Sequence, residues 1–286
     1  FDAESLDWAG SPISALPVDA LEALKEAERL DVSPALGTQF FRFNVDTFPF
    51  SNKSLRKALC YAINRQNIVD HVTQGGQQPA CGFLPPSVAI AEKPYFSDND
   101  TAAAKAFFLQ ALEELKLSPE GLRDILESSS SAIMYTKNDR DHKIVQAIQQ
   151  QWESVFDIKI PLQVQESKTY FSKRRSGSFT IANSSWIGDF SDPITFLDIF
   201  SDKNHAANYT RWEHPVYSRL IQKIKRSDVT PEERRQSILK AEEILLDEAP
   251  IIPLFYYSFC SVKHNKLHDV VISDTGIVDF SRAYFE

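Results

Sequence analysis

Short strand-like segments alternate with longer helix-like segments through the middle of the chain, and this alternation most limits the folds open to it. Residues 139–156 place Ile144, Ile148 and Trp152 on one helical face, so a helix is predicted there. Strand-like patterns lie on both sides of this helix, over residues 131–136, 158–164 and 178–186. Strands that alternate with helices along a chain indicate the α/β class. We therefore expect an α/β fold.

The same patterns predict further elements on either side of this middle part. Helices are predicted over residues 18–30, from Ser51 or Asn52 to about residue 74, and over residues 102–115, 168–175, 215–226 and 231–248. The last of these helices has a clear start signal, with Thr230 as the cap and Pro231 at the first position. Strands are predicted over residues 37–46 and from residue 250 onward, the second one broken by Pro253. Residues 262–286 read as a short-stranded appendage.

The composition permits a large core and argues against several classes of function. The chain has 286 residues, of which 43% are hydrophobic and 12% aromatic, enough for one large domain or two small ones. Its 31 Lys and Arg against 39 Asp and Glu give a net charge of −8, so no nucleic-acid partner is expected. No run of about 18 apolar residues is present to span a membrane. The chain begins FDAES, without Met or a signal-peptide pattern, which reads as a processed chain or a piece of a longer one.

The sequence carries no common cofactor or metal motif. It has no GxxxxGKS/T, GxGxxG, GxSxG or HExxH pattern, and its six His residues are scattered. Cys60, Cys81 and Cys260 lack CxxC spacing, so zinc is not expected, while one disulfide and three unpaired thiols both remain open. We therefore expect no cofactor and no metal site.

The segment SSWIGDFSDP, residues 184–193, holds the strongest candidate for a functional residue. Asp192 directly precedes Pro193, and an Asp in this place is typical of a helix cap. Asp189 follows an apolar strand end and a Gly, so its backbone lies where a strand leaves the sheet, a common place for ligands in α/β proteins. For Asp189, a ligand role and a surface position without function both remain open. An acid/base pair of the two carboxylates is a third alternative, because their separation on a turn does not follow from the spacing.

A second candidate is the basic cluster Lys173–Arg175. It lies at the end of a predicted helix, where cations interact favourably with the helix dipole. We favour that structural role over a carboxylate-binding one.

Three sequence blocks, in the same order, resemble one protein family. The blocks are SNKSLRKALCYAINRQNIV with GGQQPACGFLPP after it, then WIGDFSDPITFLDIF, then TPEERRQSILKAEEILLDEAPIIPLFYY. They resemble the bacterial oligopeptide- and dipeptide-binding proteins of solute-binding family 5, which are the substrate-binding components of ABC importers. The resemblance implies the C-terminal lobe of a type II periplasmic binding protein, with a mixed sheet flanked by helices.

Members of this family are about twice as long as this chain and hold their peptide in a cleft between two lobes. The resemblance therefore implies three parts. Residues 1–36 would be a flanking segment of the first lobe and a hinge. Residues 37–250 would be the α/β peptide-binding lobe, and residues 251–286 a hinge strand and a return segment to the first lobe.

The resemblance also implies roles for residues of the SSWIGDFSDP segment. Asp189 matches the Asp that pairs with the α-amino group of the peptide. Trp186, Ile187 and Gly188 match the strand edge along which the peptide backbone lies, and Trp186 would also wall a side-chain pocket. Asn183 stands where some oligopeptide binders have an Arg that meets the peptide carboxylate.

Further peptide-binding residues are implied outside this segment. Arg174 lies near an Arg position that helps to meet the peptide carboxylate, and Phe171 belongs to the same predicted set. His142 lies within one residue of a His that can reach the C-terminus of a peptide. Ser167 replaces a Trp of some relatives, which would leave a roomier or more polar pocket.

The family implies a function without catalysis. We expect an extracytoplasmic receptor, periplasmic or held at the cell envelope and with or without a lipid anchor, that is a monomer and delivers oligopeptides to the permease and ATPase of an ABC importer. A related receptor with another cargo, such as a murein peptide, a sugar, haem or a metal chelate, is the first alternative. An acid/base hydrolase that uses Asp189 is the alternative from another class.

Overall fold

A seven-stranded mixed sheet forms the framework of the protein, whose computed structural model describes residues 6–286. The strand order is β1-β7-β2-β6-β4-β5, and β3 pairs separately with β7. Only β4 runs parallel to its neighbours β5 and β6, while the other pairs are antiparallel. The strands are β1 (Trp8–Gly10), β2 (Asp31–Phe43), β3 (Gln78–Pro79), β4 (Ile133–Thr136), β5 (Leu162–Gln165), β6 (Ile181–Ile187) and β7 (Ile251–Lys263).

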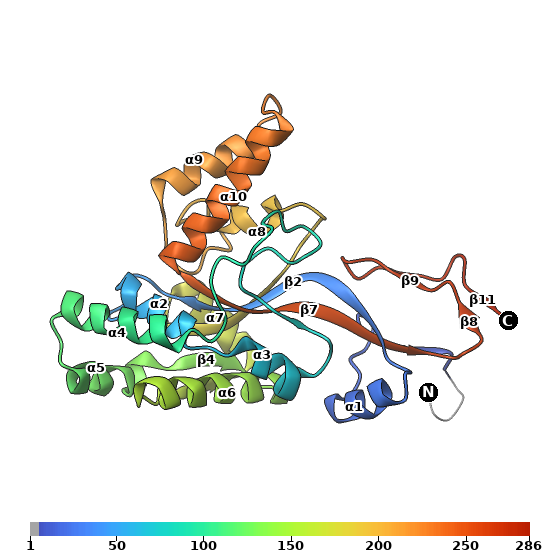
Figure 1. Ribbon diagram of the computed structural model, residues 1–286, viewed down its shortest axis with the longest axis horizontal. Helices are drawn as coiled ribbons and strands as arrows, with labels where there is room; N and C mark the ends of the chain where they lie inside the picture. Colours follow the sequence, from blue (N-terminus) through green and yellow to red (C-terminus); the bar gives the residue numbers. More distant parts are fainter. Residues whose placement is uncertain (1–5) are drawn as a thin grey trace.

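Two strands of 13 residues each, β2 and β7, run side by side across the whole molecule (Figure 1). One end of this pair lies in the large body, with β6, β4 and β5. The other end carries an extended arm that holds α1 (Val18–Glu26), β1 and two short strand pairs. These pairs are β8 (Leu267–His268) with β11 (Tyr284–Phe285) and β9 (Val271–Ile272) with β10 (Val278–Asp279). The prediction of a short-stranded appendage after residue 262 is therefore confirmed.

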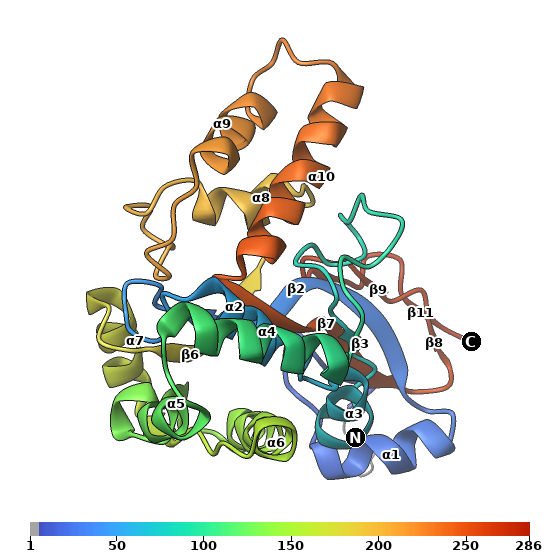
Figure 2. The ribbon, with the colours of Figure 1, turned by 60° about the vertical axis from the view of Figure 1, so that its left-hand side comes forward.

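Helices cover both faces of the sheet because successive side chains of the central strands point to opposite sides. On β2, Phe41 and Phe43 belong to the core on one face, whereas Phe40 belongs to the core on the other face. The first face carries α2 (Lys53–Tyr61), α3 (Arg65–Ile68), α4 (Thr101–Leu115), α5 (Pro119–Leu126) and α6 (Asp139–Phe156). The second face carries α7 (Ser167–Ser176), α8 (Ile194–Leu197), α9 (Pro215–Ile224) and α10 (Pro231–Glu248). Figure 2 shows α9 and α10 projecting as a pair on the side of the sheet opposite α5 and α6.

The predicted α/β class is confirmed, and so are the best marked helices. The predicted helix 139–156 is α6, with the same bounds. Thr230 begins α10 with a complete capping box, in which the Glu233 side chain bonds back to the cap. The helix predicted over residues 18–30 ends earlier, at Glu26, and β2 begins at Asp31 rather than at residue 37.

Two predictions about continuity were wrong. The helix predicted from residue 51 to about residue 74 is broken, because the Asn64 side chain accepts a hydrogen bond from Asn67 N and begins a new helix, α3. A π-helical turn, Val69–Thr73, follows it. Conversely, Pro253 does not break β7. The pairing of β2 with β7 shifts register next to Pro253, and this irregularity accommodates a residue that has no N–H to donate.

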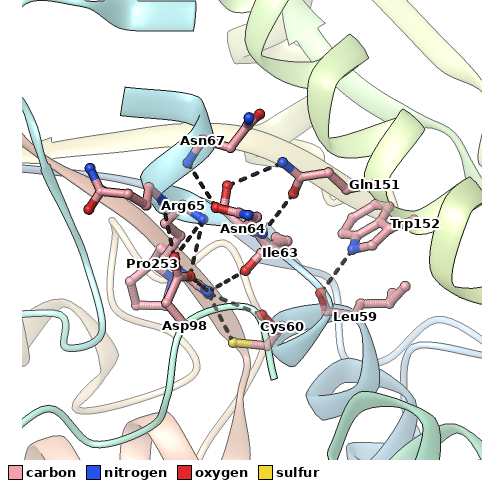
Figure 3. A network of polar contacts seen from close by, with 11 residues as sticks. Leu59, Cys60, Ile63, Asn64, Arg65, Asn67, Asp98, Gln151, Trp152 and Pro253 are labelled. Atoms are coloured by element: carbon pink, nitrogen blue, oxygen red, sulfur yellow. Dashed lines mark hydrogen bonds and ion pairs between the residues drawn. The ribbon is translucent and has the colours of Figure 1, made fainter. Parts of the chain in front are cut away.

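Two buried arginines join the helices to β7 and to α10. Arg65 donates from Nε to Pro253 O at 2.7 Å, from Nη1 to Asp98 at 3.0 Å and from Nη2 to Cys60 O at 3.2 Å, as Figure 3 shows. Arg56 donates from Nε to Ala249 O at 3.0 Å and from Nη2 to the last carbonyl of α10 at 2.6 Å. Their charges are buried with near-complete sets of acceptors, which is the condition for burying a guanidinium without a large penalty.

Candidate ligand-binding site

The C-terminal half of β6 has an unpaired side. Antiparallel pairing with β2 continues to Ile187, but β4 pairs only with Ile181 and Ala182. Gly188 N donates to Leu36 O at 2.8 Å and therefore faces β2. Because residues of an antiparallel strand face alternate neighbours, Ser185 and Ile187 direct their N–H and C=O groups away from β2. Both residues are exposed, so β6 offers backbone groups to an added strand.

Asp189 lies just beyond this open edge, in agreement with the prediction that its backbone lies where a strand leaves the sheet. It is exposed, and its own N–H donates to Thr195 Oγ1 at 3.1 Å. Within residues 6–286, no side chain forms an ion pair or hydrogen bond with its carboxylate. The Asp189 carboxylate therefore lies at the end of the open edge of β6 without a side-chain partner in this part of the chain.

Gly188 and Trp186 lie on the opposite, covered side of the same segment. A Cβ on Gly188 would come within 2.6 Å of Leu36 Cδ2, so the close approach of the segments around Gly188 and Leu36 requires glycine at position 188. Trp186 is partly buried against the core on the α8–α10 face, and its Nε1 is buried without an acceptor in the described chain.

Asp192 is used inside the fold. Its carboxylate accepts a hydrogen bond from Ile194 N at 2.9 Å, at the start of α8. It also forms an ion pair with Arg234 at 2.7 Å. Asp192 was predicted to cap this helix; the N-cap position of α8 is Pro193, and Asp192 instead holds the first helical N–H from the residue before it. Arg234 is a partner that the sequence pattern did not indicate. Because Arg234 also contacts the second carboxylate oxygen, Asp192 is not a free acid or base beside Asp189.

Asn183 is buried and turned inward. Its Oδ1 accepts a hydrogen bond from Gln39 Nε2 at 2.5 Å, and Gln39 Oε1 in turn accepts one from the Tyr257 hydroxyl. Its backbone carbonyl accepts a hydrogen bond from the Tyr170 hydroxyl. Burial raises the pKa of the Tyr257 phenol, and Arg140 acts in the opposite direction. The Asn183 side chain is therefore used inside the protein, where it links β6 to Gln39 of β2.

The remaining predicted site residues lie on two different faces. His142 is exposed on the first turns of α6, and its Nδ1 lies 2.6 Å from the Tyr135 hydroxyl at the end of β4. Phe171 and Arg174 lie on α7, on the other face of the sheet, with the Arg174 guanidinium 4.9 Å from the centre of the Phe171 ring. Ser167 is the exposed first residue of α7. The structure thus brings together residues 186–189 and separates His142 from Phe171 and Arg174.

Sequence reasoning missed several residues next to the open edge. Gln39 and Tyr257 form the polar layer beneath it, and the Arg140 guanidinium lies 5.1 Å from the centre of the Tyr257 ring. The only local signal was Gln39, a polar residue directly before the apolar part of a strand. Its bond to Asn183 joins residues 144 positions apart and has no local sequence pattern.

Residues 6–286 contain no group of three or more His, Cys, Asp or Glu side chains that could hold a metal ion. All three cysteines are free thiols, so of the two alternatives the disulfide is excluded. No helix in the described part of the chain is sufficiently long and apolar to cross a membrane.

Comparison with known proteins agrees with this geometry. The profile described as Bacterial extracellular solute-binding proteins, family 5 Middle, matches residues 3–208. The oligopeptide-binding protein OppA of Bacillus subtilis (strain 168) is 36% identical over 289 residues, which cover 100% of this chain and 52% of that protein. The periplasmic murein peptide-binding protein MppA of Escherichia coli (strain K12) is 29% identical over 252 residues, 88% of this chain and 46% of that protein.

A solved structure gives the same result. The OppA of Haemophilus influenzae in complex with RPPGFSPFR superposes with a TM-score of 0.79 at 26% identity, over 96% of this chain and 52% of that one. The fold is that of the type II periplasmic binding proteins. Within this class, the chain belongs to the bacterial extracellular solute-binding proteins of family 5. It spans about half the length of the curated relatives it matches.

Proposed function

We propose that the protein carrying this chain is an extracytoplasmic receptor that binds oligopeptides by their backbone and charged termini. The observation that carries the proposal is the open edge of β6, with Asp189 free at its end. Ser185 and Ile187 would pair with the backbone of an extended peptide, and Asp189 would accept its α-ammonium group. Backbone groups and termini are common to all peptides, so such a site binds many sequences.

The energy of such contacts is sufficient for useful affinity. A carboxylate and an ammonium about 4 Å apart attract each other by about 4 kcal/mol at an effective dielectric constant near 20, before desolvation. Hydrogen bonds to charged groups contribute about 1.5–3 kcal/mol net. A lobe that closes over the peptide would exclude water and strengthen both contributions.

We also propose that the bound peptide is released unchanged to the permease and ATPase of an ABC importer, from a monomeric receptor in the periplasm or at the cell envelope. Against hydrolysis stands the ion pair of Asp192 with Arg234, which leaves Asp189 without a second free carboxylate on the same turn. The relative named for murein peptides makes a peptide of the cell wall an alternative cargo for the same edge.

Calorimetry with the intact protein and a pair of peptides that differ only by N-acetylation tests the proposal. Acetylation removes the ammonium charge, so we expect affinity to fall about 10- to 100-fold. Equal binding of both peptides would refute the role of Asp189. Failure to bind any member of a diverse peptide library would refute the proposed function itself.

A further inference from the structure

The hairpin formed by β9 and β10 returns from the arm and contacts the turn that carries Asp189. Figure 1 shows this hairpin directed back toward the large body. At its tip, the Asp274 carboxylate accepts hydrogen bonds from the Ser191 hydroxyl, at 3.1 Å to Oδ1 and 3.0 Å to Oδ2. Ser191 follows Asp189 by two residues, whereas Asp274 lies 83 positions beyond Ser191. The last part of the chain thus reaches the candidate ligand site.

The backbone of Asp274 is fixed by strand β2. The pairing of β2 with β7 shifts register between Pro34 and Thr38, so β7 supplies no ladder partner for Leu36. Leu36 N donates instead to Asp274 O at 2.6 Å, and Leu36 is completely buried. The carbonyl of Leu36 accepts a hydrogen bond from Gly188 N at 2.8 Å. Leu36 therefore connects the tip of the hairpin with the first residue of the turn.

The tip of the hairpin is also held by its own hydrogen bonds. Ser273 N donates to Ile277 O, and Ile277 N donates to the Ser273 hydroxyl, both at 2.9 Å. Gly276 has a φ of +87°, which glycine adopts without a steric penalty. Because these bonds already order the backbone around Asp274, its contact with Ser191 costs little more than the freedom of two short side chains.

The turn after β6 is held at both ends and is exposed in the middle. It starts at Gly188, which is bonded to β2, and ends at Asp192, which forms the ion pair described above. Between them, Phe190 is 51% exposed, and the Ser191 side chain makes its contact with the hairpin. The Asp189 carboxylate has no side-chain partner among residues 6–286, so its position depends on how firmly this turn is held.

We propose that Asp274 is a positioning residue for the ligand: it holds Ser191 and thereby fixes the Asp189 carboxylate where an ammonium group binds. A charged group that is fixed before binding loses less conformational freedom when the ligand arrives, so more of the interaction energy appears as affinity. Asp274 acts through the turn and not by contact with the ligand. The inference rests on the proposed function, because the ammonium group is that of the peptide.

Three variants of the intact protein separate this role from a change of charge. Asp274→Ala and Ser191→Ala each remove the bond, whereas Asp274→Asn keeps an oxygen that accepts from Ser191. Calorimetry gives the ratio of Kd values for an N-acetylated peptide and the same peptide with a free amino terminus. We expect both Ala variants to lower this ratio about threefold to tenfold and Asp274→Asn to stay within about twofold of wild type. Asp279→Ala, which removes an exposed carboxylate from the same hairpin, should keep the wild-type ratio.

Three results would overturn the inference. The first is that Asp274→Ala or Ser191→Ala keeps the wild-type ratio. The second is that Asp279→Ala lowers the ratio as much as Asp274→Ala does. The third is that Asp274→Asn lowers it equally, since Asp274 would then act by its charge and not by holding Ser191.

Hydrogen–deuterium exchange without ligand separates this link from the proposed function. We expect the amides of residues 187–192 to exchange faster in Asp274→Ala and Ser191→Ala than in wild type and in Asp279→Ala, because the turn opens more often. If no peptide binds to the wild type but exchange changes in this way, the proposed function fails and the link between hairpin and turn stands. Unchanged exchange in both Ala variants would overturn the link.

Discussion

Asp189 and Asp192 lie three residues apart, yet the fold gives them opposite environments. Asp192 accepts a hydrogen bond from Ile194 N at the start of α8 and pairs with Arg234, so its charge is compensated within the protein. Asp189 is exposed and its carboxylate has no partner within the described residues. A compensated carboxylate contributes mainly to stability, whereas a free one at an open strand edge contributes mainly to binding.

We therefore expect opposite effects from replacing each of them by Ala. Asp189→Ala should weaken binding of peptides with a free amino terminus about 10- to 100-fold and leave the Tm nearly unchanged. Asp192→Ala should cost about 1–2 kcal/mol of unfolding free energy, because Ile194 N and Arg234 lose their acceptor, with a smaller change in affinity. Calorimetry with one peptide and thermal unfolding of both variants check this, and the reverse pattern would contradict the assignment.

Among the elements, α2 and α10 are joined by ion pairs of Lys53 and Lys57 with Asp247 and Glu248, and by one buried side chain, Arg56. Arg56 of α2 donates to Phe50 O at 2.7 Å and Ser51 O at 3.1 Å near its own helix start, and to the C-terminal carbonyls of α10. The last carbonyls of a helix have no partner within the helix, so a buried helix end needs such a donor. A planar guanidinium is suited to bridge acceptors in several directions.

Arg56→Lys keeps the charge but has one nitrogen in place of three. We expect a loss of at least about 2–3 kcal/mol of unfolding free energy, because buried carbonyls of α10 lose their donor. Chemical denaturation measures the loss. Arg123→Lys, at an exposed ion pair with Asp157, is the matched control and should change stability by less than about 1 kcal/mol. Equal losses in the two variants would disprove the bridging role of Arg56.

Elements defined by local signals were predictable from the sequence. The helix α6 and the start of α10 follow from apolar period and capping residues alone. The interruption at Asn64 had a local signal that the prediction overlooked, the bond of its side chain to Asn67 N, whereas the continuity of β7 through Pro253 was not predictable because it depends on residues far away in the chain. Pro253 O, for instance, is held by Arg65, which is 188 positions distant.

The candidate site also has features that neighbouring residues predict and features that depend on distant parts of the chain. The strand exit at Asp189 and the bond of Asp192 to Ile194 N at the start of α8 follow from a few neighbouring residues. The open side of β6 does not, because it arises where β4 stops pairing after Ala182. The inward position of Asn183 and the bond of Ser191 to Asp274 also depend on tertiary contacts, so no spacing rule could have revealed them.

At the scale of the whole molecule, one buried carboxylate holds a long loop onto α10. Glu242 is 1% exposed, and its oxygens accept hydrogen bonds from Phe83 N at 2.8 Å, Leu84 N at 2.9 Å and the Tyr95 hydroxyl at 2.9 Å. Burial raises the pKa of this carboxyl above its usual value of 4.5, although the three donors act against the shift. The folded protein therefore holds this proton more tightly than the unfolded chain does.

This shift has a definite consequence for stability. Between pH 4.5 and the raised pKa, the folded state binds more protons than the unfolded state, so the contribution of Glu242 to stability falls as pH rises through that range. We expect the Tm of wild type relative to Glu242→Gln to decrease from pH 4.5 upward and then become constant. Glu243→Gln, which removes an exposed carboxylate from the same helix, controls for net charge. A constant difference between wild type and Glu242→Gln at all pH values would contradict the shift.

The open side of β6 also bears on how molecules of this protein meet one another at high concentration. An unpaired strand edge is a template for a strand of any other chain, including an identical copy. Here the available length is short, since only Ser185 and Ile187 present free backbone groups, and the net charge of −8 opposes close approach of copies. A peptide lying on this edge would occupy the same hydrogen-bonding groups, so the peptide-bound protein would lack the surface through which unbound copies could aggregate.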